Sequence, residues 1–384
     1  MHGRRILLIG NFFFAIFSSL ITFVLLPFLS QYMSASAAGF VLAGGALCAL
    51  LLFPTLPDLV ERYGAKKLAL AFALIEVAVL FGLGGKPPLF GAIILMMLTV
   101  AVQPCIAYEL DLLLEATIEE HASTGQVRAL FRTAWNTACL IAPLLLGAVL
   151  VKSDAYDHVF ITAAAMLAPL IVFFSANRLA RGPVPRLARM RETLHHIARN
   201  HDLGAVTFAN FCLYLFLAWA PLYTPVYLHE VLGFSWSDLG GIFAIMLIPY
   251  VLIEYPAGLV ADRYLGDKEL MFAGFVIAGG GLAMLANVTS ATPLSSLLLI
   301  LAGSRIGAAL LETTVDAHFF RRISRKDIAT VSVFRAAWPL SYVIAPIVGS
   351  TLLTLGGYHT LFLYTGGFIA ISGVLAALLI RDFR

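Results

Sequence analysis

Charged residues are scarce in this chain of 384 residues. Asp, Glu, Lys and Arg make up only 12% of it, whereas 60% of the residues are hydrophobic. A soluble domain usually carries about 25% charged residues. The chain therefore cannot cover a water-facing surface, and we predict an integral membrane protein. The apolar runs also lack the alternation of apolar and polar residues that is typical of membrane β-barrels, which favours spanning helices.

Cysteines and catalytic motifs are scarce as well. The four cysteines, Cys48, Cys105, Cys139 and Cys212, all lie inside apolar runs, without the spacing of a disulfide framework or a zinc site. The sequence contains no Gly-x-Ser-x-Gly motif, no Walker loop and no paired metal-ligand histidines. We therefore expect no enzyme activity, no cofactor, no metal site and no nucleic-acid partner.

Long apolar runs dominate the sequence instead. Short polar breaks such as Gly356-Gly357 separate them, and each run is long enough to cross a bilayer as a helix. We predict twelve spanning helices, at residues 5–30, 36–56, 67–84, 89–111, 128–151, 157–177, 203–228, 237–257, 268–287, 294–316, 330–354 and 358–380.

The placement of Lys and Arg predicts the orientation in the membrane. If the N-terminus is cytoplasmic, only Lys86 and Lys152 fall clearly on the opposite side. Cytoplasmic loops carry the excess of basic residues in membrane proteins, so we expect both termini in the cytoplasm. The basic residues 1–5 lead into an apolar run without a cleavage site, which predicts a retained first helix in the plasma membrane.

One connection, residues 179–201, is long and polar. It is rich in arginine, and Leu187, Met190, Leu194 and Ile197 recur in it at helical spacing. This pattern predicts a basic amphipathic helix against the lipids of the cytoplasmic membrane face. It would join an N-terminal bundle, residues 1–178, to a C-terminal bundle, residues 202–384. A simple polar linker is the alternative.

The two halves of the chain repeat one another. Phe131-Arg132-Thr133-Ala134-Trp135 returns as Phe334-Arg335-Ala336-Ala337-Trp338, and Ile141-Ala142-Pro143 returns as Ile344-Ala345-Pro346 at the same offset. A charged stretch around Glu61-Arg62 also returns around Asp262-Arg263. Such matches indicate an internal repeat. We therefore predict an all-α fold of two six-helix bundles related by a pseudo-two-fold axis, the architecture of a rocking transporter.

The charged stretches carry a family resemblance. The chain resembles the bacterial, twelve-helix members of the major facilitator superfamily, whose loop between helices 2 and 3 reads Gly-x-x-x-Asp-Arg-x-Gly-Arg/Lys-Lys. The first copy departs from this motif at Pro57, Glu61 and Ala65, and the second has one extra residue before its glycine. The residues that fit are Arg62, Gly64, Lys66 and Lys67 in the first copy, and Gly258, Asp262, Arg263, Gly266 and Lys268 in the second.

The resemblance implies a central cavity lined by the first, fourth, seventh and tenth spanning helices. It also implies a cytoplasmic gate, in which Glu61 and Asp262 each cap the start of a helix in the other half. A carboxylate at a helix N-terminus is stabilised by the helix dipole. The alternative is that these charged stretches are topology signals only.

Arg305 is the most conspicuous candidate for substrate binding, because it lies near the middle of the tenth run. A guanidinium at this depth must face water, a carboxylate or an anionic substrate. The alternative is a structural pair with an intramembrane acid. Further candidates lie on the runs expected to line the cavity, where interhelical hydrogen bonds or packing are the alternatives: Gln103, Tyr108, Ser18, Thr22, Tyr214 and Trp219.

Acidic residues inside the runs are candidates for proton coupling. Glu76 and Glu254 have no adjacent base in the sequence, and an apolar setting favours the protonated carboxyl. They are coupling sites or passive structural acids. Duplicated sets of acid and arginine suggest ion pairs that break and re-form, or static pairs that hold each bundle: Glu109, Asp111 and Arg132 in one half, and Glu312, Asp316 and Arg335 in the other.

These features predict a secondary transporter that moves a small organic solute by alternating access. We expect a monomer that uses protons as the coupling ion, and we favour efflux by antiport. Ala142 precedes Pro143 where the drug–proton antiporters of the family carry glycine, which weakens that assignment. Uptake or facilitated transport of an organic anion or a sugar is the alternative, and a transporter-like receptor or scaffold is the alternative from another class.

Overall fold

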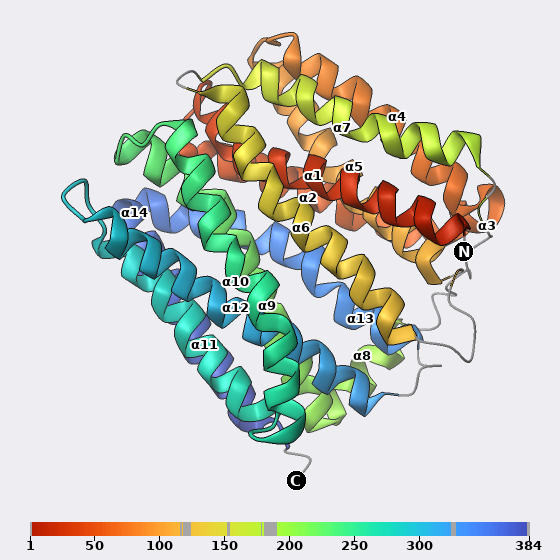
Figure 1. The fold of residues 1–384 in the computed structure, drawn as a ribbon, viewed down its shortest axis with the longest axis vertical. Coiled ribbons are helices and arrows are strands. Elements are labelled where there is room, and N and C mark those ends of the chain that lie inside the picture. The colour runs from red at the N-terminus through yellow and green to blue at the C-terminus, as the bar shows by residue number, and fades with distance from the viewer. Residues whose placement is uncertain are drawn as a thin grey trace. The chain divides into compact units, whose positions relative to one another are not determined.

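The computed structural model describes residues 2–115, 117, 124–151, 154–177, 179, 190–323 and 328–381. Within these ranges every regular element is helical (Figure 1). The elements up to residue 199 are α1 (His2–Ser30), α2 (Ala35–Leu52), η1 (Phe53–Thr55), α3 (Leu56–Tyr63), α4 (Ala65–Gly84), α5 (Leu89–Glu115), α6 (Thr124–Leu150), α7 (Tyr156–Ala176) and α8 (Met190–Arg199). They are followed by α9 (His201–Val226), the π-helical turn η2 (Tyr227–Val231), α10 (Trp236–Arg263), α11 (Asp267–Met284), η3 (Leu285–Asn287), α12 (Leu294–Arg322), α13 (Ile328–Arg335) and α14 (Ala337–Leu379).

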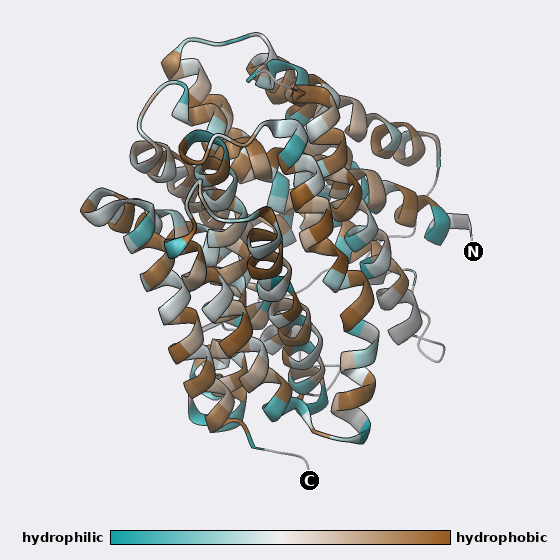
Figure 2. Cartoon of the chain, turned by 60° about the vertical axis from the view of Figure 1, so that its left-hand side comes forward, coloured by the Kyte–Doolittle hydropathy of each residue, from teal (hydrophilic) through white to brown (hydrophobic). Residues whose placement is uncertain are grey.

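Eleven helical stretches of the described chain are long and apolar enough to cross a membrane. The last of them, Val333–Leu379, has 47 residues, about twice the length that one crossing needs. It is interrupted at Gly356 and Gly357, whose backbone angles are not helical, so it holds two spans as expected. Figure 2 shows hydrophobic residues along the helices. The predicted fold class, an all-α integral membrane protein, is confirmed.

The charged stretch after the second span is a helix end and not the short turn that we expected. Residues 56–63 form α3, and the chain turns only at Gly64, where φ is 84°. In the second copy α10 continues to Arg263, and Gly266 turns with φ 97°. Asp, Glu, Leu and Arg allow a helix, whereas positive φ favours glycine. The motif glycine therefore determines where each helix ends.

The eleventh predicted helix, residues 330–354, is interrupted near its start. α13 ends at Arg335 and α14 begins at Ala337. Pro339 explains the break, because a proline has no N–H and its ring clashes with the carbonyl four residues earlier, that of Arg335. The first half has Asn136 at the equivalent position, and α6 runs through it without interruption.

The chain divides into two compact units, which are described here separately. Unit 1 comprises Met1–Arg186 and Phe234–Ala244, and unit 2 comprises Leu187–Gly233 and Ile245–Arg384. In unit 1, α1 contacts α6 and α7, while α5 contacts α2 and α4. In unit 2, α11 lies between α12 and α14, and α9 contacts both of these helices. Large side chains such as Phe17, Phe160, Phe216 and Phe362 fill the interiors.

Helix α8 is the described part of the predicted basic linker. Its ten residues include Ile197, which is buried, and Leu194, which is half exposed. The helix contacts α9 and α13 of unit 2. Most of the linker's arginines lie outside the described residues. The proposed contact of the linker with membrane lipids therefore stays a prediction.

Candidate substrate-binding and coupling site

Arg305 is buried inside unit 2, on α12. Only 4% of the residue is exposed. Its guanidinium carbon lies 5.1 Å from the centre of the Phe216 ring on α9, a distance at which a cation is attracted to an aromatic face. Tyr250 of α10 makes a side-chain hydrogen bond with it. Arg305 Nε has no hydrogen-bond partner among the described residues, so one donor of a buried cation remains available.

The small residues of α12 explain why the guanidinium points away from α11. A Cβ added at Gly307 would clash with the backbone nitrogen of Ala278, so this face of α12 lies directly against α11. Residues two apart on a helix point about 200° apart. Arg305 therefore projects from the opposite face. Glu312, two turns further along α12, attracts the Arg305 guanidinium electrostatically. This attraction partly supports the alternative that Arg305 is paired with an intramembrane acid.

In unit 1 the structure brings two of the predicted substrate contacts together. Gln103 of α5 donates a hydrogen bond to the Ser18 hydroxyl of α1, and both residues are almost completely buried. Thr22 donates to the Ser18 carbonyl over 2.8 Å. The bond between Gln103 and Ser18 joins two membrane helices, whereas the bond of Thr22 stays within α1. Gln103 and Ser18 thus have a structural contact within the bundle, and their role in substrate binding stays a prediction.

The aromatic candidates differ in their surroundings. The Trp219 indole on α9 donates to the Ala345 carbonyl of α14 over 2.7 Å, and the residue is buried. Tyr108 is half-buried, with its ring 5.8 Å from that of Phe53. Tyr214 is half-buried as well. Trp219 thus joins two helices of unit 2, whereas the two tyrosines keep part of their surface open.

Glu109 on α5 is the buried acid that stands out. The residue is 0% exposed, and neither carboxyl oxygen has a hydrogen-bond partner among the described residues. A buried carboxylate without a partner is very costly, and such a group takes up a proton instead. Glu76 on α4 is also fully buried, but it accepts a hydrogen bond from Thr99 on α5, which favours the structural alternative for Glu76.

The remaining members of the duplicated acid–arginine sets are only partly buried. Each has interactions of its own, and none of them is a free charge. Glu254, the other candidate acid, is also partly buried and also has interactions of its own. The residues concerned are Asp111, Arg132, Glu312, Asp316 and Arg335. Whether their ion pairs break during transport stays a prediction.

The motif lysines tie each unit together. Lys66, at the start of α4, donates to the Asn177 carbonyl after α7 over 2.7 Å. Lys268, at the start of α11, donates to the Leu378 carbonyl at the end of α14 over 2.9 Å. Lysine side chains bind the unpaired carbonyls at helix C-termini favourably. The same bond thus occurs once in each half, within the unit, and not across a gate.

The other predicted gate residues lie at the surface or outside the described side chains. Glu61, Arg62, Lys67 and Arg263 are exposed, and Gly258 is half-buried. The side chain of Asp262 is among those that the structure does not describe. The capping of helices in the other half by Glu61 and Asp262 therefore stays a prediction.

Comparison with known proteins identifies the family. The sequence model of the Major Facilitator Superfamily matches residues 7–248 and 206–382. The chain belongs to the Major Facilitator Superfamily. An uncharacterised transporter of this type, YhhS from Escherichia coli O157:H7, is 28% identical over 165 residues, which are 39% of this chain and 40% of that protein. The chain thus matches less than half of the length of this relative.

Solved structures of other transporters share the fold of the superfamily. The nucleoside transporter NupG aligns over 99% of this chain and 99% of its own, with a TM-score of 0.76 and 15% identity. A POT family transporter in complex with a thioalcohol-conjugated peptide aligns over 97% of this chain and 95% of its own, with a TM-score of 0.79 and 12% identity. At such low identity the likeness concerns the fold alone.

The sequence analysis missed one pair of buried polar residues, which are two asparagines in equivalent helices of the two halves. Asn11 of α1 donates to the Phe131 carbonyl of α6 over 3.0 Å. Asn210 of α9 donates to the Phe334 carbonyl of α13 over 2.8 Å. Both asparagines are 1% exposed. A signal was present in the sequence, since the two intramembrane asparagines occur 199 residues apart, close to the repeat offset of 203.

Replacing Asn210 with leucine is expected to destabilise unit 2 by about 1–3 kcal/mol, the cost of leaving a buried carbonyl unpaired. Phe334 lies at the interrupted helix end, where carbonyls lack a partner within the helix. Asn11→Leu is the matched control and should cost less, because α6 is continuous at Phe131. Thermal unfolding of the detergent-solubilised protein measures both. Equal losses in the two variants would contradict this account of the interruption.

Proposed function

We propose that this protein is a secondary active transporter that moves a small organic anion across the membrane by alternating access. The observation that carries the proposal is the unpaired Nε of Arg305 inside unit 2. A buried guanidinium donor without a partner favours a ligand that brings a negatively charged oxygen, and charge-assisted hydrogen bonds of this kind are the strong ones. Phe216 and Tyr250 would position the guanidinium.

We propose further that transport is coupled to protons and that Glu109 carries the coupling proton. Its carboxyl is buried without a partner among the described residues, so a proton stabilises it when water is excluded. When the cavity opens to water, hydration stabilises the carboxylate and the proton leaves. Efflux by antiport is the direction that we favour, and symport of the same anion is the second possibility.

The membrane placement belongs to the same proposal. The positive-inside distribution supports a bacterial inner membrane location with both termini in the cytoplasm. Glu61 and Asp262 would close the cytoplasmic side of a monomeric transporter by capping helices of the opposite unit. A receptor or scaffold without flux is the alternative function from another class.

Proteoliposomes test the function directly. The purified protein is reconstituted and offered labelled organic anions, cations and sugars, with the vesicle interior made acidic, alkaline or equal to the outside. Antiport predicts that an anion accumulates when the interior is acidic, because protons leaving the vesicle drive it inward. Symport predicts accumulation with an alkaline interior. Protein-free vesicles show how much of a weak acid enters passively, and flux of none of the compounds under any gradient would support the scaffold.

Glu109→Gln in the same assay tests the coupling. Glutamine resembles a protonated glutamate in shape and cannot ionise. Exchange of labelled for unlabelled anion across the membrane should persist, whereas accumulation driven by a pH gradient should disappear. If gradient-driven accumulation equals that of the wild type, Glu109 is a structural acid and the coupling site lies elsewhere.

A further inference from the structure

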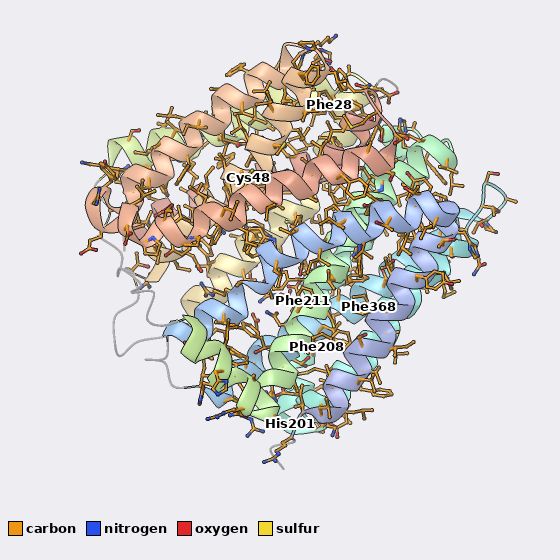
Figure 3. The ribbon with its side chains drawn as sticks, turned by 180° about the vertical axis from the view of Figure 1, so that it is seen from behind. Phe28, Cys48, His201, Phe208, Phe211 and Phe368 are labelled. Atoms are coloured by element: carbon orange, nitrogen blue, oxygen red, sulfur yellow. The ribbon has the colours of Figure 1, made fainter. Side chains whose placement is uncertain are left out.

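A buried histidine near the end of α12 lies between two carboxylates. His318 is 1% exposed. Its Nδ1 lies 3.2 Å from Oδ2 of Asp267, the first residue of α11. Its Nε2 lies 3.3 Å from Oδ2 of Asp202, in the first turn of α9. Figure 3 labels His201, which precedes Asp202, at this end of unit 2.

The two contacts require one proton more than a neutral ring supplies. A neutral imidazole has one N–H and one nitrogen lone pair, and an ionised carboxylate can only accept. With a neutral ring, one of the two contacts would set a lone pair against a carboxylate oxygen. An imidazolium donates from both nitrogens, so it satisfies both aspartates at the observed distances. The geometry therefore points to a protonated His318.

Two arginines bind the same two carboxylates. Arg321 of α12 forms an ion pair with Asp267, and Arg322 Nε lies 2.6 Å from Asp202 Oδ2. Lys268, which follows Asp267 in the chain, binds the Leu378 carbonyl instead of a carboxylate of this cluster.

The cluster also holds the end of the described chain. The Arg381 backbone N–H donates to Asp202 Oδ1 over 2.7 Å, and Arg322 donates to the Arg381 carbonyl over 2.7 Å. Four segments thus meet at one buried proton: the start of α9, the start of α11, the end of α12 and the segment after α14. Loss of the proton would turn one attraction into a repulsion at the point where all four meet.

One member of the cluster, Asp267, has no acidic counterpart in the first half of the chain. Ala65 follows the motif glycine where Asp267 follows it in the second half. The lysine bond to the end of the last helix, by contrast, is present in both halves. Asp267 is therefore specific to the second half, whereas the lysine bond belongs to the repeated scaffold.

We propose that His318, Asp202 and Asp267 form a proton-binding site that fastens this end of unit 2, and that alkaline conditions release the proton and loosen the four segments. The site is separate from Arg305 and Glu109, so the inference does not depend on the proposed function. On the orientation that we predict, it faces the cytoplasm, whose pH would then set how firmly these helix ends are held.

The first test is nitrogen NMR of the full-length protein in detergent, with ¹⁵N-labelled histidine. The signal of His318 is assigned by its loss in His318→Asn. We expect both of its ring nitrogens to give imidazolium signals at about pH 7.5, where an ordinary exposed histidine, which titrates near pH 6.5, is mostly neutral. The signal of His201, which is exposed, is recorded in the same spectra for comparison. A neutral tautomer of His318 at this pH would overturn the proposal.

The second test is thermal unfolding between about pH 6 and pH 9. On the proposal, the folded state binds a proton that the unfolded chain does not hold, so stability should fall as the pH rises. Asp202→Asn should flatten this fall, because an amide can donate to a neutral ring. His201→Asn is the matched control and should keep the wild-type slope. Parallel curves for the wild type and Asp202→Asn would overturn the proposal, even if His318→Asn did not fold.

Discussion

Replacing Arg305 with alanine is expected to reduce transport of the anion about 10- to 100-fold. A hydrogen bond to a charged group contributes about 1.5–3 kcal/mol, and each 1.4 kcal/mol is about a factor of ten in affinity. The loss should appear first as a higher KM, because the guanidinium binds the substrate and carries no proton. Initial rates in proteoliposomes, measured over a range of anion concentrations, separate KM from the maximal rate.

Two further variants make this result specific to Arg305. Arg305→Lys keeps the charge but loses the planar fork and the stacking on Phe216, and lysine does not replace arginine at such sites. It should therefore fall between alanine and the wild type. Arg199→Ala removes an exposed arginine of α8 in the same unit and should transport normally. If Arg305→Ala folds and transports as well as the wild type, Arg305 is a structural residue.

The sequence predicted the spanning helices well, for a reason that is local. A bilayer requires about 20 apolar residues in a row, so composition alone marks where each helix can lie. The break at Gly356 and Gly357 followed from turn chemistry in the same way. Pro339 alone could not have predicted the interruption after Arg335, because α1, α5, α6 and α7 each continue through a proline.

The interhelical contacts could not be predicted in this way. Trp219 was a candidate for substrate contact, and the sequence did not reveal that its indole donates to the Ala345 carbonyl. No pattern in the sequence singled out His318, although it lies between two buried carboxylates. Both contacts depend on which helix faces pack together. An apolar run without a clear polar face does not reveal which of its faces packs against a neighbouring helix. The repeat is the exception, because Asn11 and Asn210 make the same bond twice.

The contact between α11 and α14 gives the second large prediction. A Cβ added at Gly279 would lie 2.5 Å from the nitrogen of Ala370 and 2.6 Å from the carbonyl oxygen of Gly366. Both are backbone atoms, so no side-chain rotation can make room. Figure 1 shows α11 running beside α14 within unit 2. Gly279→Ala must therefore push two long helices apart, and it should cost about 3 kcal/mol, at the upper end for overpacking.

Gly280→Ala is the control that isolates this steric effect. It adds the same methyl group one residue later on the same helix, where nothing lies within 4 Å of the new Cβ. Alanine has the higher helix propensity, so this variant should be as stable as the wild type or slightly more stable. Thermal unfolding and the monodisperse fraction after detergent extraction measure both variants. Because membrane helices gain no hydrophobic drive to associate, close backbone contact is what holds them together. A Gly279→Ala protein as stable as Gly280→Ala would mean that α11 and α14 are held by other contacts.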